Sequence, residues 1–491
     1  MPVLPTYSND DIALYLTDGY WADSNPPAIR HSFPISPGGT LTIDMSTVAA
    51  AGQFLATKAL EAWTMVSGIN FSIINISGAD ITFTDDGGSA NPVGGSSWYI
   101  PSGEALDGFV DVPFEWLDTY GTGLDSYSFL TYMHEIGHAL GIGHAGNYNG
   151  TGGYAEDGSG DNDYLNDSWQ ATIMSYFSPY ENTSIAANWD YWTSGFIGVM
   201  TPMIADILAI QDLYGVAGNL RSGNTVYGEG STAGGYYDSN LTARSAFTII
   251  DDGGVDEIDF KSETANQIVD LSPEGISSVG GFTGNMVIMR DTIVEKFFSG
   301  SGDDEIFGNL ADNVLWGGAG EDLIVGAGGS DVIRGEEDSD VIKGGPGDDI
   351  LNGNGRGDVI IGGSGNDILR GGNGKDRLNG GDDDDILMGG IGRDKLIGGA
   401  GADTFVFKSG WAVDRVSDFE DDVDTISLDS SLWGGGLTVA QLLDPINGYA
   451  SVVSNNGNGG EHVELNFSGG DILKIHGITN VNALLDDILI F

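Results

Sequence analysis

The second half of the chain carries an apolar residue at every ninth position. From residue 299 to residue 405 this spacing never slips, and an aspartate stands two residues before each apolar position except one, where Asn313 replaces it. Such a strict period predicts a repetitive fold in which every repeat buries one side chain against its neighbours. The apolar positions are Ile306, Leu315, Ile324, Ile333, Ile342, Leu351, Ile360, Leu369, Leu378, Leu387, Leu396 and Phe405.

The polar residues of each repeat are suited to binding calcium. The most regular copies read Gly-Gly-x-Gly-x-Asp and lie at 344–349, 362–367, 371–376 and 398–403. Glycine-rich turns can direct carbonyl oxygens inward, and the aspartate adds an anionic oxygen, which together suit an ion that takes six to eight oxygen ligands. The pattern is that of the calcium-binding nonapeptide repeat and predicts a parallel β-roll. A flexible Gly/Asp linker is the alternative, but the constant apolar position argues against it.

The candidate calcium ligands of the array are its aspartates and the glycines of its regular turns. They are Gly318, Gly320, Asp322, Asp331, Asp340, Gly345, Gly347, Asp349, Asp358, Gly363, Gly365, Asp367, Gly372, Gly374, Asp376, Asp385, Gly390, Gly392, Asp394, Gly399, Gly401 and Asp403. Some copies are irregular, because Asp338, Arg356 and Asp383 each replace a turn glycine. We expect weak or missing calcium sites at these copies.

The segment 1–215 shows helical and strand periodicities instead of the nonapeptide. An alanine-rich amphipathic stretch over 46–67 predicts a helix that Ser46 or Thr47 caps and Gly68 ends. The other expected elements are strands at 71–76 and 80–84, a helix from about 126 to 140, and a helix over 202–214 that ends at Gly215. This mixture predicts an α+β domain.

Residues 134–144 have the form HExxHxxGxxH, which fits a catalytic zinc site. His134 and His138 are one helical turn apart, so both can bind one metal ion. Gly141 can adopt a left-handed conformation without steric cost, which lets the chain reverse and bring His144 back as the third ligand. Three protein ligands leave one position of the zinc open for water or substrate.

Glu135 is rotated by about 100° from His134 on the helix, so we expect it to face a water on the zinc and to take its proton. The pattern HExxH alone could arise by chance, but the glycine and the third histidine make the zinc site the stronger interpretation. Met174 lies beyond the zinc motif, in the sequence Ile-Met-Ser-Tyr. Alone it would be an ordinary core residue; at its distance from His144 it indicates the methionine turn of the metzincins.

Composition excludes several classes of protein. The chain of 491 residues has no cysteine, which excludes disulfides and leaves zinc to histidine ligands. Its formal net charge of −54 argues against nucleic acid or an anionic membrane as a partner. No run approaches about 18 apolar residues, so no membrane span is expected. Residues 1–30 lack the basic and apolar regions of a secretory signal peptide.

The zinc motif, the methionine turn and the nonapeptide array together resemble the serralysins, secreted zinc metalloproteases of the metzincin clan. The resemblance implies an α+β metzincin protease domain followed by an all-β parallel β-roll with a β-sandwich-like C-terminal part. The expected domains are a protease domain over 1–215, a connecting β segment with an interdomain calcium site over 216–298, a calcium-binding (RTX) β-roll over 299–405, and a C-terminal β region over 406–491.

The resemblance also implies roles for residues outside the motif. Tyr176 matches the tyrosine that ligates zinc in the resting enzyme and then stabilises the tetrahedral intermediate. Ala145 departs from the proline that usually follows the third histidine, and we expect it to loosen the loop that carries His144. The matching calcium ligands are Arg221, Gly223, Thr225, Asp251, Gly253, Gly254 and Asp256 for the interdomain site, and Glu295, Gly300, Gly302 and Asp304 for the first site of the roll.

The sequence ends Asp-Asp-Ile-Leu-Ile-Phe, which resembles the uncleaved signal read by type I secretion machinery; a buried final strand is the alternative. We therefore expect a monomeric, secreted bacterial endopeptidase that holds one catalytic Zn²⁺ and several structural Ca²⁺ and cleaves proteins and peptides. The rival interpretations are a non-enzymatic calcium-binding surface or adhesion protein with a decayed protease domain, and a metzincin of another family, which the nonapeptide array disfavours.

Overall fold

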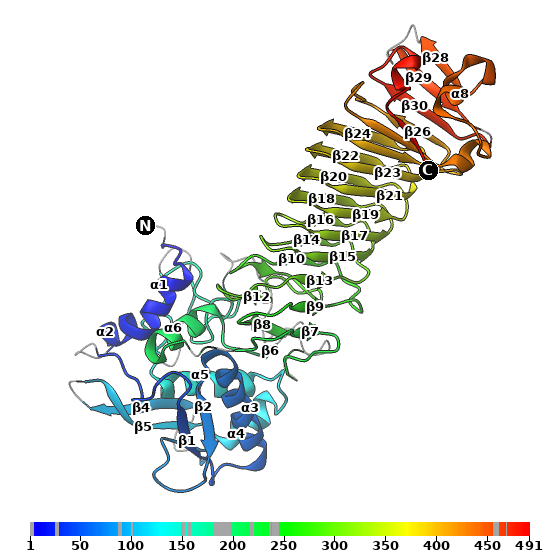
Figure 1. Cartoon of the computed structure of the whole chain (residues 1–491). Coiled ribbons are helices and arrows are strands. Elements are labelled where there is room, and N and C mark those ends of the chain that lie inside the picture. The colour runs from blue at the N-terminus through cyan, green and yellow to red at the C-terminus, as the bar shows by residue number, and fades with distance from the viewer. Residues whose placement is uncertain are drawn as a thin grey trace. The chain divides into compact units, whose positions relative to one another are not determined.

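The computed structural model describes most of the chain. The described residues are 4–24, 29–86, 91–99, 102–148, 153–155, 159–179, 182, 198–216, 218, 220–234, 237, 245–454, 461–467 and 469–491. They form two compact units, one from Met1–Gly254 with Pro273–Thr292 and the other from Val255–Ser272 with Ile293–Phe491 (Figure 1). Within these ranges, no helix is both long enough and apolar enough to cross a membrane.

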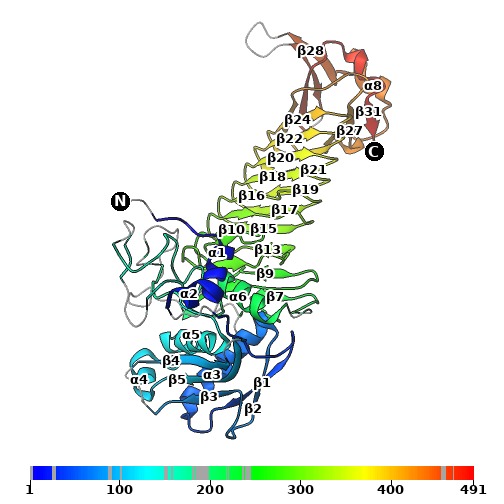
Figure 2. The same ribbon diagram turned by 90° about the vertical axis from the view of Figure 1, so that its left-hand side faces the viewer.

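The first unit is built on a five-stranded sheet in the order β2-β1-β3-β5-β4, in which only β4 runs antiparallel to its neighbour. Helices α3 (Ala50–Ser67) and α5 (Tyr127–Leu140) pack against each other (Figure 2). The indole of Trp63 donates a hydrogen bond of 3.0 Å to the carbonyl of Met133 between them. The strands are β1 Thr40–Asp44, β2 Asn70–Ile73, β3 Ile81–Thr84, β4 Val93–Tyr99 and β5 Glu104–Asp111.

Shorter elements complete this unit. Helix α6 (Ile204–Tyr214) contacts both α1 and α3, and a second small sheet has the strand order β11-β12-β8-β6. The remaining elements are α1 Asn9–Leu14, a π-helical turn Tyr15–Gly19, α2 Tyr20–Ser24, α4 Phe114–Tyr120, β6 Gly198–Val199, β7 Val226–Gly228, β8 Ser245–Ile249, β11 Ile276–Ser277 and β12 Met286–Ile288.

The predicted helices and strands of this unit are present, but the start of α3 differs from the prediction. The helix begins at Ala50, and neither Ser46 nor Thr47 caps it. The side chain of Asp85, distant in the sequence, instead accepts a hydrogen bond of 2.6 Å from the backbone N–H of Ala49. A partner so far along the chain satisfies a free N–H at the helix start as well as a local cap would.

The second unit is a parallel β-roll, which confirms the predicted fold class. Strands alternate between two sheets, and each strand of the roll pairs with the next but one along the chain; Leu315 pairs with Ile333, and Ile333 with Leu351. The twelve apolar positions of the array are at most 1% exposed. The strands of the roll are β9 Glu257–Asp259, β10 Ile268–Asp270, β13 Lys296–Phe298, β14 Glu305–Phe307, β15 Val314–Ala319, β16 Leu323–Val325, β17 Val332–Glu337, β18 Val341–Pro346, β19 Ile350–Asn354, β20 Val359–Ser364, β21 Ile368–Gly374, β22 Arg377–Asp382, β23 Ile386–Gly392, β24 Lys395–Ala400 and β25 Thr404–Phe407.

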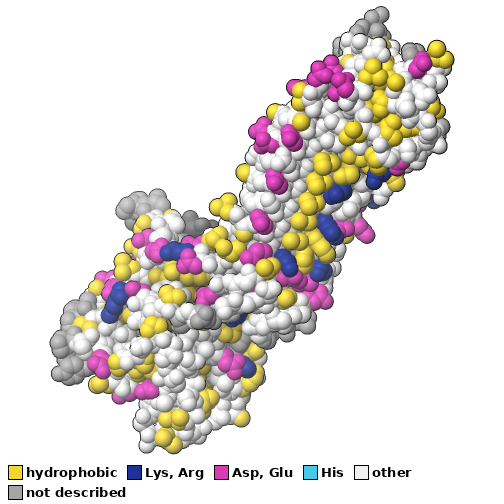
Figure 3. Space-filling model, in the orientation of Figure 1, with side chains coloured by type: hydrophobic (Ala, Val, Ile, Leu, Met, Phe, Trp, Pro, Cys, Tyr) yellow, Lys and Arg dark blue, Asp and Glu magenta, His cyan; other side chains and the backbone are white. Residues whose placement is uncertain are grey.

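The outer surface of the roll is partly apolar. Alternate residues of each strand point outward, so Ile350 and Ile386 remain 36% and 37% exposed. Figure 3 shows hydrophobic side chains along one face of the roll with lysine and arginine side chains beside them. The repeat therefore buries one apolar row completely and leaves a second row in contact with solvent.

The C-terminal region continues both sheets of the roll. Strand β26 extends one sheet and pairs with β30, which joins an antiparallel meander with β29 and β28. Strand β27 extends the other sheet, and β31 adds to it in parallel. The elements are β26 Val413–Val416, β27 Thr425–Leu428, a 3-10 helix Ser430–Trp433, α8 Val439–Leu443, a 3-10 helix Pro445–Asn447, β28 Ala450–Ser454, β29 Glu461–Asn466, β30 Ile472–His476, a 3-10 helix Val481–Leu484 and β31 Ile488–Ile490.

Candidate functional site

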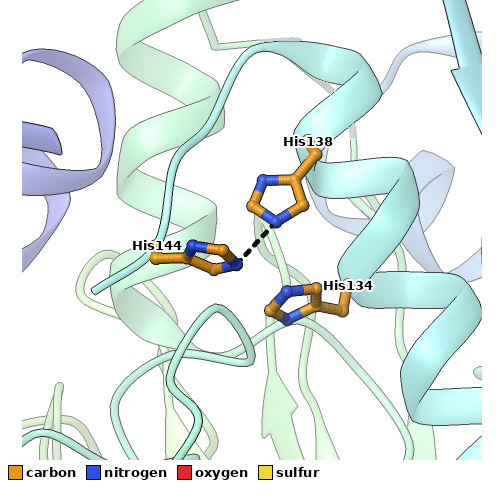
Figure 4. A group of neighbouring side chains, drawn as sticks. All are labelled: His134, His138 and His144. Atoms are coloured by element: carbon orange, nitrogen blue, oxygen red, sulfur yellow. Dashed lines mark hydrogen bonds between the residues drawn. The ribbon is translucent and has the colours of Figure 1, made fainter. Parts of the chain in front are cut away.

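Three histidine rings converge at the end of helix α5. His134 and His138 project from the helix, and His144 comes from the segment that follows it (Figure 4). One ring nitrogen of each lies within 4.8 Å of the others, and the Nε2 atoms of His138 and His144 are 3.0 Å apart. Two nitrogens at about 2.0–2.1 Å from one tetrahedral zinc ion would be roughly 3.3 Å apart. The three imidazoles therefore fit a zinc ion.

Backbone carbonyls fix the orientation of two of these rings. The Nδ1 atom of His134 donates to the carbonyl of Ile173 at 2.8 Å, and that of His138 donates to the carbonyl of Ile142 at 2.9 Å. A ring whose Nδ1 carries the proton presents the lone pair of Nε2 to a metal. Burial lowers the pKa of His134 to about 4 and of His138 to about 3, so both rings are neutral, the form that binds a metal.

Glycines allow the close packing around this helix. Gly141 ends α5 with a φ of +105°, as the sequence predicts, and a Cβ there would lie 2.0 Å from the carbonyl oxygen of His31. A Cβ on Gly137 would lie 2.8 Å from the sulfur of Met174. The methionine therefore packs directly against the helix between the two histidines, where the methionine turn was expected.

Ala145 differs from the expectation that it would loosen the loop of His144. Its side chain is buried, and its backbone N–H donates a hydrogen bond of 3.3 Å to the carbonyl of Met174. A proline at this position has no N–H and could not form that bond. The loop that carries His144 is thus tied to the segment of Met174 through the backbone of Ala145.

Glu135 faces the same space as the histidines. It lines a cleft of about 330 Å³ together with His134 and Tyr176. Burial raises the pKa of Glu135 to about 8, against a hydrogen bond from the backbone N–H of Gly94 that lowers it. A Cβ on Gly94 would lie 2.2 Å from the carbonyl oxygen of Glu135, so strand β4 approaches α5 as closely as two backbones allow.

Tyr176 lies beside the histidine cluster. Its ring centroid is 4.6 Å from that of His144 and 6.0 Å from that of His134. Tyr148 packs against it at 4.7 Å and donates its own hydroxyl to Asp167 at 3.1 Å. The structure thus brings Tyr176 to the cleft beside Glu135, whereas Tyr148 is held behind it by a buried carboxylate.

Several residues of the site were not identified from the sequence. Trp116, Tyr127 and Trp169 line the cleft and give it aromatic walls. Asp206, on α6, is fully buried and accepts hydrogen bonds from Thr172 Oγ1 and from the backbone N–H groups of residues 173 and 203. It holds the turn that supplies the carbonyl partner of His134. None of these residues has a distinctive local pattern, because each acts through contacts between distant segments.

The aspartates of the roll form ladders along its edges. The backbone N–H of Asp349 donates to Oδ1 of Asp367 at 2.8 Å, and the N–H of Asp367 donates to Asp385 in the same way. The Oδ2 atoms are buried and have no hydrogen-bond partner within the described residues; they belong to Asp322, Asp331, Asp340, Asp349, Asp358, Asp367, Asp376, Asp385, Asp394 and Asp403. Rows of unpaired buried carboxylate oxygens fit bound cations, since an unpaired buried acceptor is otherwise costly.

The carboxylates of these aspartates leave no room for a side chain at the turn glycines. A Cβ on Gly344 would lie 2.0 Å from Oδ2 of Asp349, and one on Gly362 would lie 2.2 Å from Oδ2 of Asp367. Asp414 and Asp424 continue the two ladders, since they accept from the N–H groups of Asp394 and Asp403 at 3.1 and 3.0 Å. Neither was identified from the sequence, because both follow insertions that break the nine-residue period.

The residues expected at the interdomain calcium site are divided between the two units. In the first unit, the carboxylate of Asp251 accepts from Tyr227 Oη at 2.8 Å and from the N–H of Gly253 at 3.1 Å, and a Cβ on Gly254 would lie 2.6 Å from the backbone of Gly223. Arg221 donates to the carbonyl of residue 250 at 2.6 Å, and Thr225 donates to the carbonyl of residue 223 at 3.0 Å.

In the second unit, the N–H of Asp256 donates to Glu295 at 2.7 Å. Asp304 accepts from the N–H of Gln267 at 2.6 Å and from the hydroxyl of Ser299. Gly300 and Gly302 lie too close to the backbone of residues 263 and 265 for any side chain. Within each unit, the predicted ligands therefore lie on neighbouring turns.

Comparison with known proteins identifies the family. The family model described as Peptidase M10 serralysin C terminal matches residues 217–469. The chain is 34% identical over 328 residues to the Metalloprotease AprA of Pseudomonas entomophila (strain L48), covering 62% of this chain and 64% of that protein. It is 32% identical over 339 residues to the Serralysin of Proteus mirabilis, covering 62% and 66%. The alignments thus span somewhat less than two thirds of these relatives. Because the family model covers half of the chain, and its matched region contains the roll, this protein belongs to the serralysin family of M10 peptidases.

Proposed function

We propose that this protein is a zinc endopeptidase that cleaves peptide bonds in proteins. One observation carries the proposal: three neutral imidazoles that fit a zinc ion and the carboxylate of Glu135 border the same cleft of about 330 Å³. The relatives named Metalloprotease AprA and Serralysin support it. His134, His138 and His144 would hold the zinc. When bound, zinc polarises a carbonyl and lowers the pKa of water.

The residues of this chain would divide the remaining work of peptide hydrolysis. Glu135 takes a proton from the attacking water and delivers it to the leaving amine. The hydroxyl of Tyr176 donates to the oxygen of the scissile carbonyl as negative charge develops on it. The N–H of Gly94 and the burial of Glu135 hold that carboxylate in place. The aromatic walls of Trp116, Tyr127 and Trp169 would receive a side chain of the substrate.

Calcium would stabilise the second unit. The unpaired Oδ2 atoms of the ladder aspartates support this, because uncompensated carboxylates on successive turns would otherwise repel one another. We propose further that the protein is monomeric, extracellular and exported by type I secretion machinery, which binds in the cytosol a chain that calcium has not yet folded. Extracellular calcium modules bind in the range of about 10⁻⁴–10⁻³ M, which is consistent with folding after export.

The substitution Glu135→Ala tests the catalytic proposal. The variant should retain one zinc ion per chain by metal analysis and lose casein cleavage by at least about 10²-fold, the lower range for general acid–base catalysis. Glu104→Ala, an exposed glutamate on β5, is the matched control and should retain activity. Full cleavage by the Glu135 variant would contradict the mechanism.

The same assays separate the enzyme from the rival interpretation. A calcium-binding adhesion protein with a decayed protease domain would cleave no casein, whatever its zinc content. The proposed enzyme should cleave casein, lose that activity in a zinc chelator while calcium is kept in excess, and recover it when zinc is added. Absence of cleavage by zinc-loaded wild-type protein would favour the adhesion protein.

A further inference from the structure

The strands of one sheet of the second unit share an aspartate immediately before the strand. This holds for β17, β19, β21, β23, β25, β27 and β31, preceded by Asp331, Asp349, Asp367, Asp385, Asp403, Asp424 and Asp487. Asp487 is the last of the series and lies far outside the nonapeptide array, before the final strand of the chain. The pairing of Ile426 with Ile488 places Asp487 opposite Thr425, one residue out of register with the ladder, and places Asp486 opposite the ladder residue Asp424.

Asp487 also shares the buried environment of the ladder aspartates. It is 7% exposed, and its Oδ2 atom has no hydrogen-bond partner among the residues the structure describes. Its carboxylate accepts a hydrogen bond from the backbone N–H of Asp422, in the turn before β27. Its backbone carbonyl accepts from the N–H of Ile426 at 2.8 Å. A buried carboxylate oxygen without a partner is costly unless a cation or a proton satisfies it.

Two more carboxylates lie close to that of Asp487. Asp422 and Asp486 are exposed, and one carboxylate oxygen from each lies within 4.8 Å of that of Asp487 and of the other. In the described part of the chain, no lysine or arginine forms an ion pair with any of the three, and the neighbouring Asp421 adds further negative charge. Burial and these neighbours raise the pKa of Asp487. Three like charges at this distance repel one another unless a cation lies between them.

We propose that Asp422, Asp486 and Asp487 form a calcium site that fixes the C-terminal strand to the roll. Carboxylate oxygens suit Ca²⁺ and Mg²⁺ rather than transition metals. Ca²⁺ tolerates irregular geometry and takes more protein oxygens than Mg²⁺, which keeps several of its waters. Three aspartates from two separate turns form an irregular set and therefore favour Ca²⁺.

Calcium at this site would join two segments that are distant in the sequence. Asp422 precedes β27, while Asp486 and Asp487 precede β31, and these strands pair in parallel through Ile426 and Ile488. In β31, Ile488 is buried, whereas Leu489 and the following Phe491 are 59% and 54% exposed, so apolar burial of this strand rests mainly on one side chain. The bound ion therefore adds to the attachment of the last strand, and its loss should loosen the C-terminus.

The test uses the full-length protein loaded with Ca²⁺ at millimolar concentration. The double variant Asp422→Asn/Asp486→Asn removes two exposed ligands and leaves the buried Asp487 in place, so its fold should survive. Native mass spectrometry should count one calcium ion fewer than in the wild type. Hydrogen exchange of the β31 amides should be at least tenfold faster, with no change in strands β17–β23. Glu420→Gln, an exposed carboxylate shortly before Asp422, is the matched control and should leave both readouts unchanged.

A second variant, Asp487→Asn, should give the same loss of one ion and faster exchange in β31. Equal calcium counts and equal β31 exchange in the wild type and the double variant would overturn the proposal. The same loss in Glu420→Gln would also overturn it, since the effect would then follow net charge alone. Zinc content and casein cleavage are separate readouts, so failure of the proposed protease activity would leave this test intact.

Discussion

The carbonyl oxygen of Ile173 accepts a hydrogen bond from Nδ1 of His134 at 2.8 Å, which joins helix α5, with two of the proposed zinc ligands, to the segment that contains Met174. The backbone N–H of the same Ile173 donates to Asp206 at 2.9 Å. One residue of this segment thus connects a buried carboxylate on α6 to a proposed metal-ligand ring on α5. A group that hydrogen-bonds to a metal ligand in this way orients the ligand without touching the metal.

Replacing Asp206 by asparagine should weaken zinc binding. The carboxylate accepts from Thr172 Oγ1 at 2.5 Å and from the N–H groups of Ile173 and Met203 at 2.9 Å each, and an amide has only one oxygen to accept them. Loss of such a partner typically lowers metal affinity by about 10–100-fold. Competition with a chromogenic zinc chelator would measure the change.

The control for this prediction is Asp212→Asn on the same helix. Asp212 pairs with Arg30 at 2.6 Å on the surface, where ion pairs contribute little to stability. It should leave zinc affinity unchanged. If the Asp206 variant binds zinc as tightly as the Asp212 variant, Asp206 does not position His134.

Replacing Tyr176 by phenylalanine should lower kcat while zinc remains bound. Removing one donor to a developing oxyanion costs about 10²–10³-fold in kcat. Tyr148→Phe is the matched variant, because its hydroxyl is bound to the buried Asp167 and not directed to the cleft. That change should lower the melting temperature, since Asp167 would lose a partner, but should largely retain kcat. Equal losses of kcat in both variants would argue against a catalytic role for Tyr176.

The sequence predicts those parts of this protein whose contacts are made by residues close together, or regularly spaced, along the chain. The zinc motif is confined to eleven positions, so helix geometry alone brings His134 and His138 together. The roll follows from a period in which each turn packs on the next, which is why Leu315 through Leu396 could be named as buried. In both cases, the relevant contacts are fixed by spacing along the chain.

Contacts between distant segments could not be predicted in this way. Asp85, directly after β3, accepts a hydrogen bond at the start of α3, and Gly94 approaches Glu135 from β4. Asp414 and Asp424 continue the aspartate ladders after insertions that break the period. Such residues resemble ordinary surface aspartates or loop glycines in the sequence, and only the folded chain shows which backbone they meet.

Without calcium, the roll should be more stable at acidic pH than at alkaline pH. Burial, together with neighbouring carboxylates, raises the pKa of Asp322 and Asp358 to about 8 and of Asp331 to about 7, whereas an unfolded chain has values near 3.9. A folded-state pKa above the unfolded value gives stability that is complete below about pH 4 and is lost as the pH rises through 7–8. Far-UV circular dichroism in a calcium chelator should therefore show more β structure at pH 5 than at pH 8.

Saturating calcium should reverse this dependence. Calcium needs the ionised carboxylates, so its affinity should fall as the pH drops through the same range. The pH titration of β structure with calcium and the one without calcium use the same protein, so each serves as the control for the other. A calcium-free roll that is better folded at pH 8 than at pH 5 would contradict the assignment of the ladder aspartates as raised-pKa groups.

Replacing Asp383 by glycine should stabilise the roll. Asp383 adopts a φ of +77°, a left-handed conformation that costs a residue with a Cβ about 1–2 kcal/mol. It also adds negative charge beside Asp385. Glycine removes both penalties at an entropic cost of about 0.5–1 kcal/mol, so relief of the backbone conformation alone should give a net gain of up to about 1.5 kcal/mol. The preceding Asp382 lies in β22 without a positive φ, so Asp382→Gly should destabilise the same turn. Hydrogen exchange of β22–β24 at fixed calcium would measure both changes, and shifts of the same sign in the two variants would show that charge, rather than backbone conformation, determines the effect.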